Sequence, residues 1–268
     1  VNLPICQCVD LLICRFDNVS MCQCVDMLIC RCISSPSLAR ACSSCLHRPI
    51  TAIIINMKRL FLTSSFSSVA KLFEDFTGEP VKGKKLAFIP TASLVEKVRF
   101  YVDDDRKAFE KLGLIIEELE VSTATTEEVA QALERNDYIF ISGGNTFYLM
   151  QELKKKGADK LLIEQINNGK LYIGTSAGSV IASPNIEFVS DMDEPKKAPE
   201  LTEYSGLHLV DFYLLPHYLN FPFKESSQKV VNEYSQKIDL RPISNNQVIT
   251  VLGDEIKTLE KPKRATKK

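Results

Sequence analysis

The feature that most constrains the fold is a regular alternation of short apolar runs and amphipathic stretches from Met57 onward. The apolar runs are rich in β-branched and aromatic residues, and they predict strands over residues 59–64, 85–90, 115–120, 138–142, 171–175, 212–216 and 247–252. Between them, apolar residues recur at three- and four-residue intervals and predict helices over residues 67–77, 95–112, 126–134, 146–156, 160–168 and 223–236. We therefore expect a three-layer α/β fold, a mostly parallel sheet flanked by helices, in one domain over residues 57–260.

The first 56 residues differ from this body. All nine cysteines lie before residue 46, and the sequence Cys-Gln-Cys-Val-Asp that begins at Cys6 returns at Cys22. Zinc sites pair cysteines two to four residues apart with a second half of similar spacing, which the Cys-x-Cys pairs do not match. We interpret residues 1–56 as a non-native or wrongly assigned upstream extension, expected to be poorly ordered, and residues 261–268 as a basic, solvated tail.

Composition excludes several classes of partner. The chain has 33 basic and 34 acidic residues, a formal charge of −1, so no overall field favours nucleic acid or an anionic membrane. No apolar run approaches the roughly 20 residues that a membrane-spanning helix needs. The body after Met57 has no cysteine, which is typical of a protein of a reducing compartment, so we expect a cytoplasmic location.

The strongest chemical signal is a Gly-x-Ser-x-Gly turn. Gly174-Thr175-Ser176-Ala177-Gly178 follows a predicted buried strand and precedes an apolar helix start. This is the nucleophile-elbow pattern, in which the glycines permit a tight turn that exposes the serine hydroxyl at the carboxyl end of the strand. Ser176 is therefore the predicted nucleophile, and the Ala177 amide is placed to stabilise an oxyanion.

A serine nucleophile needs a base, and the chain has three histidines. His47 lies in the leader. His208 precedes the predicted strand 212–216, whereas His217 follows it and so lies near a carboxyl end, where ligands bind in open parallel sheets. We predict His217 as the general base over His208.

A second glycine-rich turn follows the predicted strand 138–142. Gly143, Gly144 and Asn145 open a helix there and are predicted to supply oxyanion or substrate contacts. A phosphate-binding loop is the rival interpretation, but no Lys-Ser/Thr pair follows the glycines. A tight connection without a ligand is the structural alternative.

The third member of a triad would be an acid that orients the imidazole. Asp191, Asp193 and Glu194 all lie shortly after the elbow helix. The residues alone leave the choice among the three open, and ordinary solvated loop charges are the alternative.

These motifs together resemble the dipeptidase E family of serine peptidases, family S51, with cyanophycinase among its relatives. Ser142 to Phe147, Leu171 to Gly178, Ser190 to Met192 and the pair Pro216-His217 stand in the family's order. The resemblance implies a flavodoxin-like, class I glutamine-amidotransferase-like sheet. It also implies Ser176 as nucleophile, His217 as base, Asp191 as orienting acid, and the Gly144 and Ala177 amides as the oxyanion hole, with no metal or cofactor.

The predicted function is a serine exopeptidase that hydrolyses short peptides through an acyl-enzyme on Ser176. Aspartyl dipeptides are one candidate substrate, although this chain has Thr175 where the dipeptidase form has tryptophan. An amidase or esterase on the same fold, or a non-catalytic module that binds a small ligand, are the alternatives. A homodimer is compatible with the resemblance, and the sequence leaves the oligomeric state open.

Overall fold

The computed structural model describes residues 6–7, 13–14 and 57–262 of the chain. The chain divides into two units, Val1–Ile53 and Ile54–Lys268. In the first unit the described elements are two short antiparallel strands, β1 (Cys6–Gln7) and β2 (Ile13–Cys14). The expectation that residues 1–56 are poorly ordered falls mostly outside the described residues, as does most of the predicted tail.

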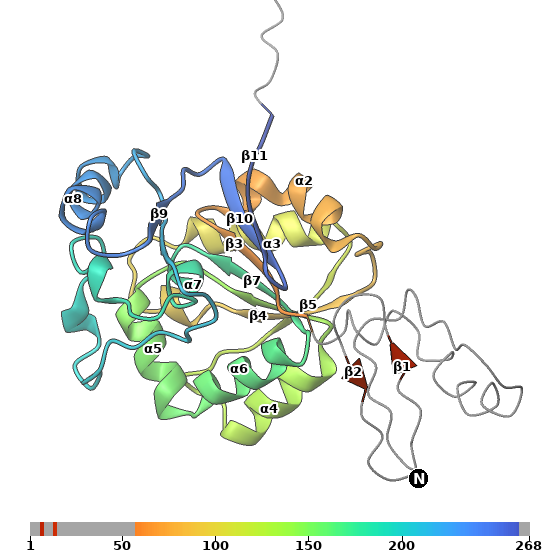
Figure 1. Cartoon of the computed structure of the whole chain (residues 1–268). Coiled ribbons are helices and arrows are strands. Elements are labelled where there is room, and N and C mark those ends of the chain that lie inside the picture. The colour runs from red at the N-terminus through yellow and green to blue at the C-terminus, as the bar shows by residue number, and fades with distance from the viewer. Residues whose placement is uncertain (1–5, 8–12, 15–56, 263–268) are drawn as a thin grey trace, which may run out of the picture. The chain divides into compact units, whose positions relative to one another are not determined.

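The second unit is built on a seven-stranded sheet in the order β11-β10-β3-β7-β6-β4-β5 (Figure 1). Neighbouring strands from β3 to β5 pair in parallel, and β10 pairs antiparallel with both β3 and β11. The strands are β3 (Arg59–Thr63), β4 (Lys85–Ile89), β5 (Ile115–Glu118), β6 (Tyr138–Ile141), β7 (Leu171–Thr175), β10 (Gln247–Leu252) and β11 (Glu255–Glu260). The predicted three-layer α/β fold with a mostly parallel sheet is confirmed.

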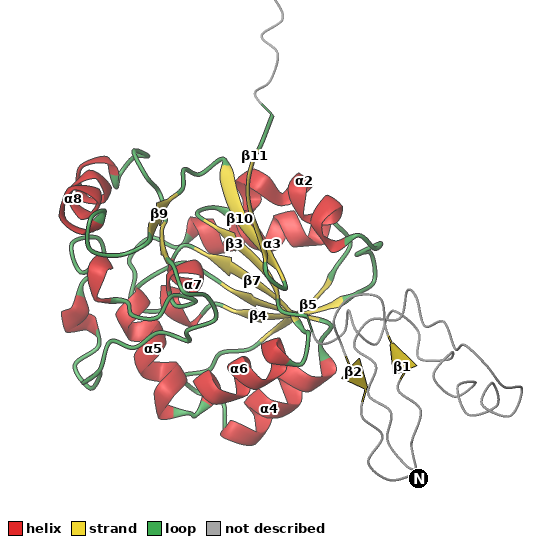
Figure 2. Ribbon diagram, in the orientation of Figure 1, coloured by secondary structure: helices red, strands yellow, loops and turns green. Residues whose placement is uncertain are grey.

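Helices cover both faces of the sheet (Figure 2). The helices α2 (Phe66–Thr77) and α3 (Phe100–Lys111) lie on one face; α4 (Thr126–Arg135), α5 (Thr146–Lys155), α6 (Ala158–Asn167) and the short α7 (Ala177–Val180) lie on the other. The predicted helix over 95–112 begins only at Phe100, because a 3-10 turn, η2 (Thr91–Ser93), and a loop precede it.

The two faces have different cores. Under α2 and α3 the buried side chains are largely aromatic, and the rings of Phe66 and Phe109 stack with centroids 3.9 Å apart. Under α4 to α7 they are mostly aliphatic, including Leu62, Ile139 and Ile141. Burial of these side chains on both faces explains why the strands read as continuous apolar runs.

One predicted strand lies outside the main sheet. Strand β8 (Tyr213–Leu215) pairs in parallel with β9 (Leu240–Pro242) in a separate two-stranded sheet. The place beside β3 in the main sheet is taken by β10, and β8 pairs with β9 instead. Helix α8 (Lys224–Tyr234) and the 3-10 turns η3 (Glu187–Val189) and η4 (Pro195–Lys197) complete the described elements.

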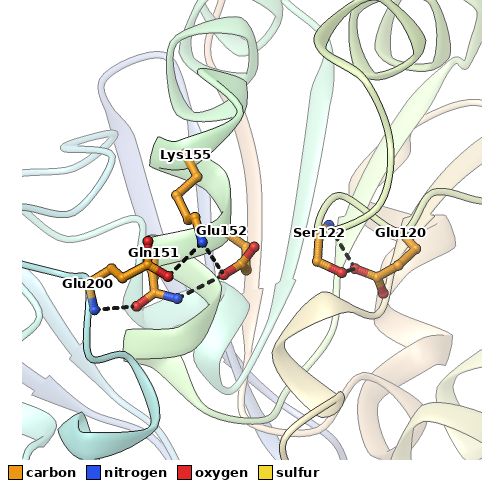
Figure 3. A network of polar contacts seen from close by, with 6 residues as sticks. All are labelled: Glu120, Ser122, Gln151, Glu152, Lys155 and Glu200. Atoms are coloured by element: carbon orange, nitrogen blue, oxygen red, sulfur yellow. Dashed lines mark hydrogen bonds and ion pairs between the residues drawn. The ribbon is translucent and has the colours of Figure 1, made fainter.

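A polar network on α5 holds the chain that follows η4 (Figure 3). The Glu200 amide donates to Gln151 Oε1 at 2.9 Å, and Gln151 Nε2 donates to Glu152 Oε1 at 2.8 Å. Lys155 Nζ lies 2.7 Å from Glu200 Oε1 and 3.9 Å from Glu152 Oε1. Both backbone and side chain of Glu200 are therefore tied to α5.

Candidate active site

Ser176 occupies a strained turn between β7 and α7. Its φ is 49° and its ψ is −111°, a conformation that residues with a side chain rarely adopt. A Cβ on Gly174 would lie 2.6 Å from the Gly178 carbonyl oxygen, and one on Gly178 would lie 2.2 Å from the Ile141 carbonyl oxygen. Both glycines of the motif are therefore required by close backbone contacts, as the elbow pattern predicts.

Strand β3 supports this turn from the side. The Ser176 amide donates to the Thr63 carbonyl oxygen at 2.9 Å. Ser179 Oγ donates to the same carbonyl at 2.8 Å and accepts the Thr63 amide at 2.9 Å. The hydroxyl groups of Thr63 and Thr175 are 2.9 Å apart. These buried contacts hold the strained backbone in place.

The structure brings His217 to Ser176. His217 Nε2 lies 3.0 Å from Ser176 Oγ, within hydrogen-bonding distance of a general base. The His217 amide donates to Ser64 Oγ at 3.0 Å, and the Phe223 ring stacks on the imidazole with centroids 4.9 Å apart. Burial lowers the pKa of His217, so the ring is neutral and able to accept a proton near pH 7.

The other nitrogen of His217 meets an amide rather than a carboxylate. His217 Nδ1 lies 2.7 Å from Oδ1 of Asn245, in the loop between β9 and β10. The backbone N–H of Asn245 donates to Asn220 Oδ1 at 2.8 Å. Sequence reasoning missed Asn245, because it stands in an irregular loop 28 positions after the histidine and belongs to no motif.

None of the three acids predicted as candidate partners of the imidazole has a described hydrogen bond to His217. Asp191 forms an ion pair with Lys229 of α8, 2.8 Å from Oδ1 to Nζ, and no described hydrogen bond joins it to His217. Asp193 accepts the Thr146 amide at 2.9 Å and also the Thr146 hydroxyl, at the start of α5. The Glu194 carbonyl accepts Asn145 Nδ2 at 3.1 Å. The predicted contact between Asp191 and the imidazole is therefore not found, because Asp191 faces α8 and Asn245 occupies Nδ1.

His208, the rival base, also lies apart from the serine. Its Nε2 is 3.0 Å from Asp211 Oδ1, and its side chain is exposed. This contact joins residues three positions apart in a surface loop and involves no residue of the elbow.

The second glycine-rich turn lies beside the nucleophile. A Cβ on Gly143 would be 3.1 Å from Ser176 Cβ and 3.7 Å from its Oγ. Gly144 has a φ of 136°, and a Cβ there would lie 2.2 Å from the Ala92 carbonyl oxygen. Asn145 caps α5, since its side-chain Oδ1 accepts the backbone N–H of Tyr148. The backbone N–H of Asn145 donates to the Ala92 carbonyl oxygen at 2.9 Å and is therefore already hydrogen-bonded within the protein.

A buried carboxylate lies behind the elbow. Asp105 of α3 is 1% exposed and accepts the Ser67 amide through Oδ1 at 2.9 Å, while its Oδ2 has no partner among the described residues. Burial raises the pKa of Asp105 to about 7, and the hydrogen bond from the Ser67 amide partly opposes this shift. Sequence reasoning missed this group, because Asp105 stands in an ordinary amphipathic helix.

No cluster of three or more histidine, cysteine, aspartate or glutamate side chains among the described residues is arranged to hold a metal ion. Among the same residues, no helix is both long and apolar enough to cross a membrane.

Comparison with known proteins gives a consistent result. The sequence model of Peptidase family S51 matches residues 59–259. An uncharacterized peptidase of Listeria innocua is 54% identical over 202 residues, which cover 75% of this chain and 96% of the relative. A Peptidase E of Nostoc is 30% identical over 169 residues, covering 61% of this chain and 66% of the relative. A crystal structure from Listeria monocytogenes EGD-e, provisionally named Peptidase E, is 53% identical with a TM-score of 0.74 and covers 77% of this chain and all of its own.

Proposed function

This chain belongs to peptidase family S51 and is a peptidase, and from that premise we propose that it is an exopeptidase that hydrolyses short peptides through Ser176 and His217. The observation that carries the proposal is the 3.0 Å contact between Ser176 Oγ and His217 Nε2 at a strained strand-to-helix turn. A nucleophile and a base within hydrogen-bonding distance are the minimal apparatus of acyl transfer.

In the proposed reaction, Ser176 Oγ attacks the scissile carbonyl carbon while His217 Nε2 accepts the hydroxyl proton. The tetrahedral intermediate collapses as the imidazolium returns this proton to the leaving amine, and the acyl group stays on Ser176. Water, deprotonated by the same nitrogen, then attacks the ester carbon, and the imidazolium returns the proton to Ser176 Oγ as the acid leaves. The imidazole of His217 carries out every proton transfer, so the same contact at Nε2 serves both the acylation and the deacylation of Ser176.

The oxyanion would be bound by the backbone amides of Ala177 and Gly144. Ala177 is the first residue of α7, so its amide has no acceptor within the helix. A Cβ added at Gly143 would lie 3.1 Å from Ser176 Cβ, so the Gly143-Gly144 turn runs beside the nucleophile. Gly143, Gly144 and Asn145 then form the wall of the substrate site.

The substrate class is proposed from the relatives. Several carry the name Peptidase E, and a short peptide fits a nucleophile flanked closely by two turns. Whether aspartyl dipeptides are preferred depends on side chains around Thr175, the position before the nucleophile. We place the reaction in the cytoplasm on the basis of the cysteine-free body, with a short peptide and neither nucleic acid nor membrane as partner, and a homodimer as the assembly to be examined.

The test is hydrolysis of a panel of dipeptides, amino-acid arylamides and the matching esters by the full chain. Ser176→Ala and His217→Ala should each abolish turnover, whereas His208→Ala and Ser190→Ala, which change exposed residues of the same types, should not. Cleavage of esters or simple amides without dipeptides would indicate an esterase or amidase. Dipeptide turnover that survives Ser176→Ala would contradict the mechanism.

A further inference from the structure

Asp191 and Asp193 stand two positions apart in one loop but contact different helices. Asp191 pairs with Lys229 of α8, whereas the carboxylate of Asp193 binds the first turn of α5. We propose that Asp193 is a positioning residue that holds the proposed oxyanion donor Gly144 in place through Thr146. The inference deepens the proposed function and rests on it for its catalytic meaning.

The loop of Asp193 supplies hydrogen-bond partners to the start of α5. The first N–H groups of a helix have no acceptor within it. Asp193 Oδ2 accepts the backbone N–H of Thr146 at 2.9 Å and also the Thr146 hydroxyl. Asn145 Oδ1 accepts the backbone N–H of Tyr148 at 2.9 Å, and Asn145 Nδ2 donates to the Glu194 carbonyl at 3.1 Å. Two consecutive residues of this loop are therefore bonded to the two residues that begin α5.

The Asp193 carboxylate is charged in mildly alkaline solution. Burial raises its pKa to about 6, with a further contribution from Glu96, while the hydrogen bonds from Thr146 and the charge of Lys197 oppose the shift. Above that pH the contacts with Thr146 are charge-assisted, which makes them stronger than bonds between neutral groups. A negative charge at the N-terminus of α5 is also favoured by the helix dipole.

The loop that carries Asp193 is itself held in place. The backbone N–H groups of Met192 and Asp193 donate to the Val189 carbonyl at 2.8 and 2.9 Å, so the loop is folded onto η3. Lys197 of η4 pairs with Glu96, in the segment after η2, with 2.8 Å between Nζ and Oε1. Asp193 is thus a fixed group against which the first turn of α5 is held.

Gly144 is packed between this helix start and η2. The backbone N–H of Asn145 donates to the Ala92 carbonyl oxygen, and a Cβ on Gly144 would lie 2.2 Å from the same atom. Within residues 57–262, no acceptor is bonded to the backbone N–H of Gly144, so this group is available to an oxyanion. A shift of Thr146 would move it, and an oxyanion donor acts only when it meets the developing charge at about 2.7–3.1 Å.

The first experiment compares Asp193→Ala, Asp193→Asn and Thr146→Val with the wild type at about pH 8, using the best dipeptide of the panel. We expect Asp193→Ala to lower kcat by about 10- to 10²-fold with KM within about threefold. Complete removal of an oxyanion donor costs about 10²- to 10³-fold, and here the donor is displaced rather than removed.

The other variants test the individual contacts. Asp193→Asn should recover most of kcat, because the amide oxygen can accept the same two hydrogen bonds. Thr146→Val keeps the backbone N–H but loses the hydroxyl, so its kcat should lie between those of Asp193→Ala and the wild type. Asp191→Ala is the matched control, since it removes the other acid of the same loop, and it should leave kcat within about threefold.

A transition-state analogue tests the oxyanion donor directly. When a peptide aldehyde inhibits the enzyme, Ser176 Oγ adds to the aldehyde carbon and the carbonyl oxygen becomes the oxyanion. Its Ki should rise in Asp193→Ala by the same factor as kcat falls, because both depend on the Gly144 N–H. A purely structural loss of substrate contacts would raise KM instead.

A further measurement needs no substrate. Hydrogen exchange of the Thr146 N–H and the ¹H–¹⁵N signal of Gly144 report the state of the helix start and of the turn. We expect exchange at Thr146 to be at least about tenfold faster in Asp193→Ala than in the wild type, and the Gly144 signal to move. Asp191→Ala should match the wild type at both positions.

The outcomes separate this inference from the proposed function. Wild-type protein without turnover, or turnover kept by Ser176→Ala, contradicts the function, while the amide signals still decide whether Asp193 positions Gly144. An unchanged Gly144 signal in Asp193→Ala would overturn the inference, as would a rise in KM alone or an equal loss of kcat in Asp191→Ala. If Asp193→Ala fails to fold, an unchanged kcat and Gly144 signal in Thr146→Val overturns it.

Discussion

The two halves of the candidate site are built in different ways. The nucleophile stands on the main sheet, where the Ser176 amide is bonded to β3 and Gly178 packs closely against the Ile141 carbonyl of β6. The base and its partner stand on two loops outside that sheet, joined to each other by hydrogen bonds and to β3 through Ser64. Regular elements thus fix the backbone of the nucleophile, whereas side-chain contacts between residues distant in sequence fix the ring of the base.

The largest effect is expected on the sheet side, at the nucleophile itself. Ser176→Gly should lower kcat/KM by roughly 10⁴- to 10⁶-fold, because no nucleophile remains. Glycine adopts positive φ without strain, so the variant should be at least as stable as the wild type, by up to about 1 kcal/mol. Activity assays and thermal unfolding measure both effects. An inactive variant that is also much less stable would contradict the assignment of strain to this residue.

The next effect concerns the neighbouring turn of the same sheet. Gly144→Ala should reduce kcat by about 10²- to 10³-fold, because the added Cβ would lie 2.2 Å from the Ala92 carbonyl oxygen and displace a proposed oxyanion donor. Gly157→Ala is the matched control, since Gly157 also has positive φ, at 64°, but has no atom within 4 Å of an added Cβ. It should lose only about 1 kcal/mol of stability and no activity. Equal loss of activity in both variants would show that the effect is not local to the site.

The contrast between the nucleophile on the main sheet and the base on outer loops also explains how much could be predicted from the sequence. The strand over Leu171–Thr175 was predicted with its observed bounds, and both glycine-rich turns were located, because buried runs and tight turns are local signals. Strands β9 and β11 were missed; β9 has three residues, and the side chains of β11 are mostly exposed, so neither gives a buried apolar pattern.

The partner of the imidazole could not be predicted for a related reason. The family resemblance implies Asp191 for this place, but contacts between loops decide which group meets the ring. Asn245 reaches His217 only because the loops around Tyr218 and Ile243 are bound together. No periodicity or composition in either loop indicates that contact.

A smaller effect is expected on stability, again on the sheet side. The pKa of Asp105 is raised by burial from its ordinary value of 3.8 to about 7, so the folded state binds this proton more tightly than the unfolded state. The stabilisation that comes from this tighter proton binding by Asp105 is fully present below pH 3.8. It is lost as the pH rises through about 7. Asp105→Asn cannot ionise, so above pH 7 it should be more stable than the wild type by about 2 kcal/mol, with a smaller difference at pH 4.

The matched control for this prediction is Asp103→Asn, which removes an exposed carboxylate from the same helix. Chemical denaturation of the three proteins from pH 4 to pH 8 measures the effect. A difference between Asp105→Asn and the wild type that stays constant over this range would show that Asp105 does not titrate with a raised pKa.

The smallest effect on activity and stability is expected at Asp191, the acid that the family resemblance implies. Asp191 pairs with Lys229 at the surface, and exposed ion pairs contribute about 0–1 kcal/mol, so Asp191→Asn should change stability little. Its kcat/KM should stay within about threefold of the wild type, because no described hydrogen bond links Asp191 to the imidazole. Lys229→Gln, which removes the other partner of the pair, should behave alike. A large loss of kcat in Asp191→Asn alone would mean that the acid reaches His217 during catalysis, and that the base side of the site rearranges while the nucleophile side does not.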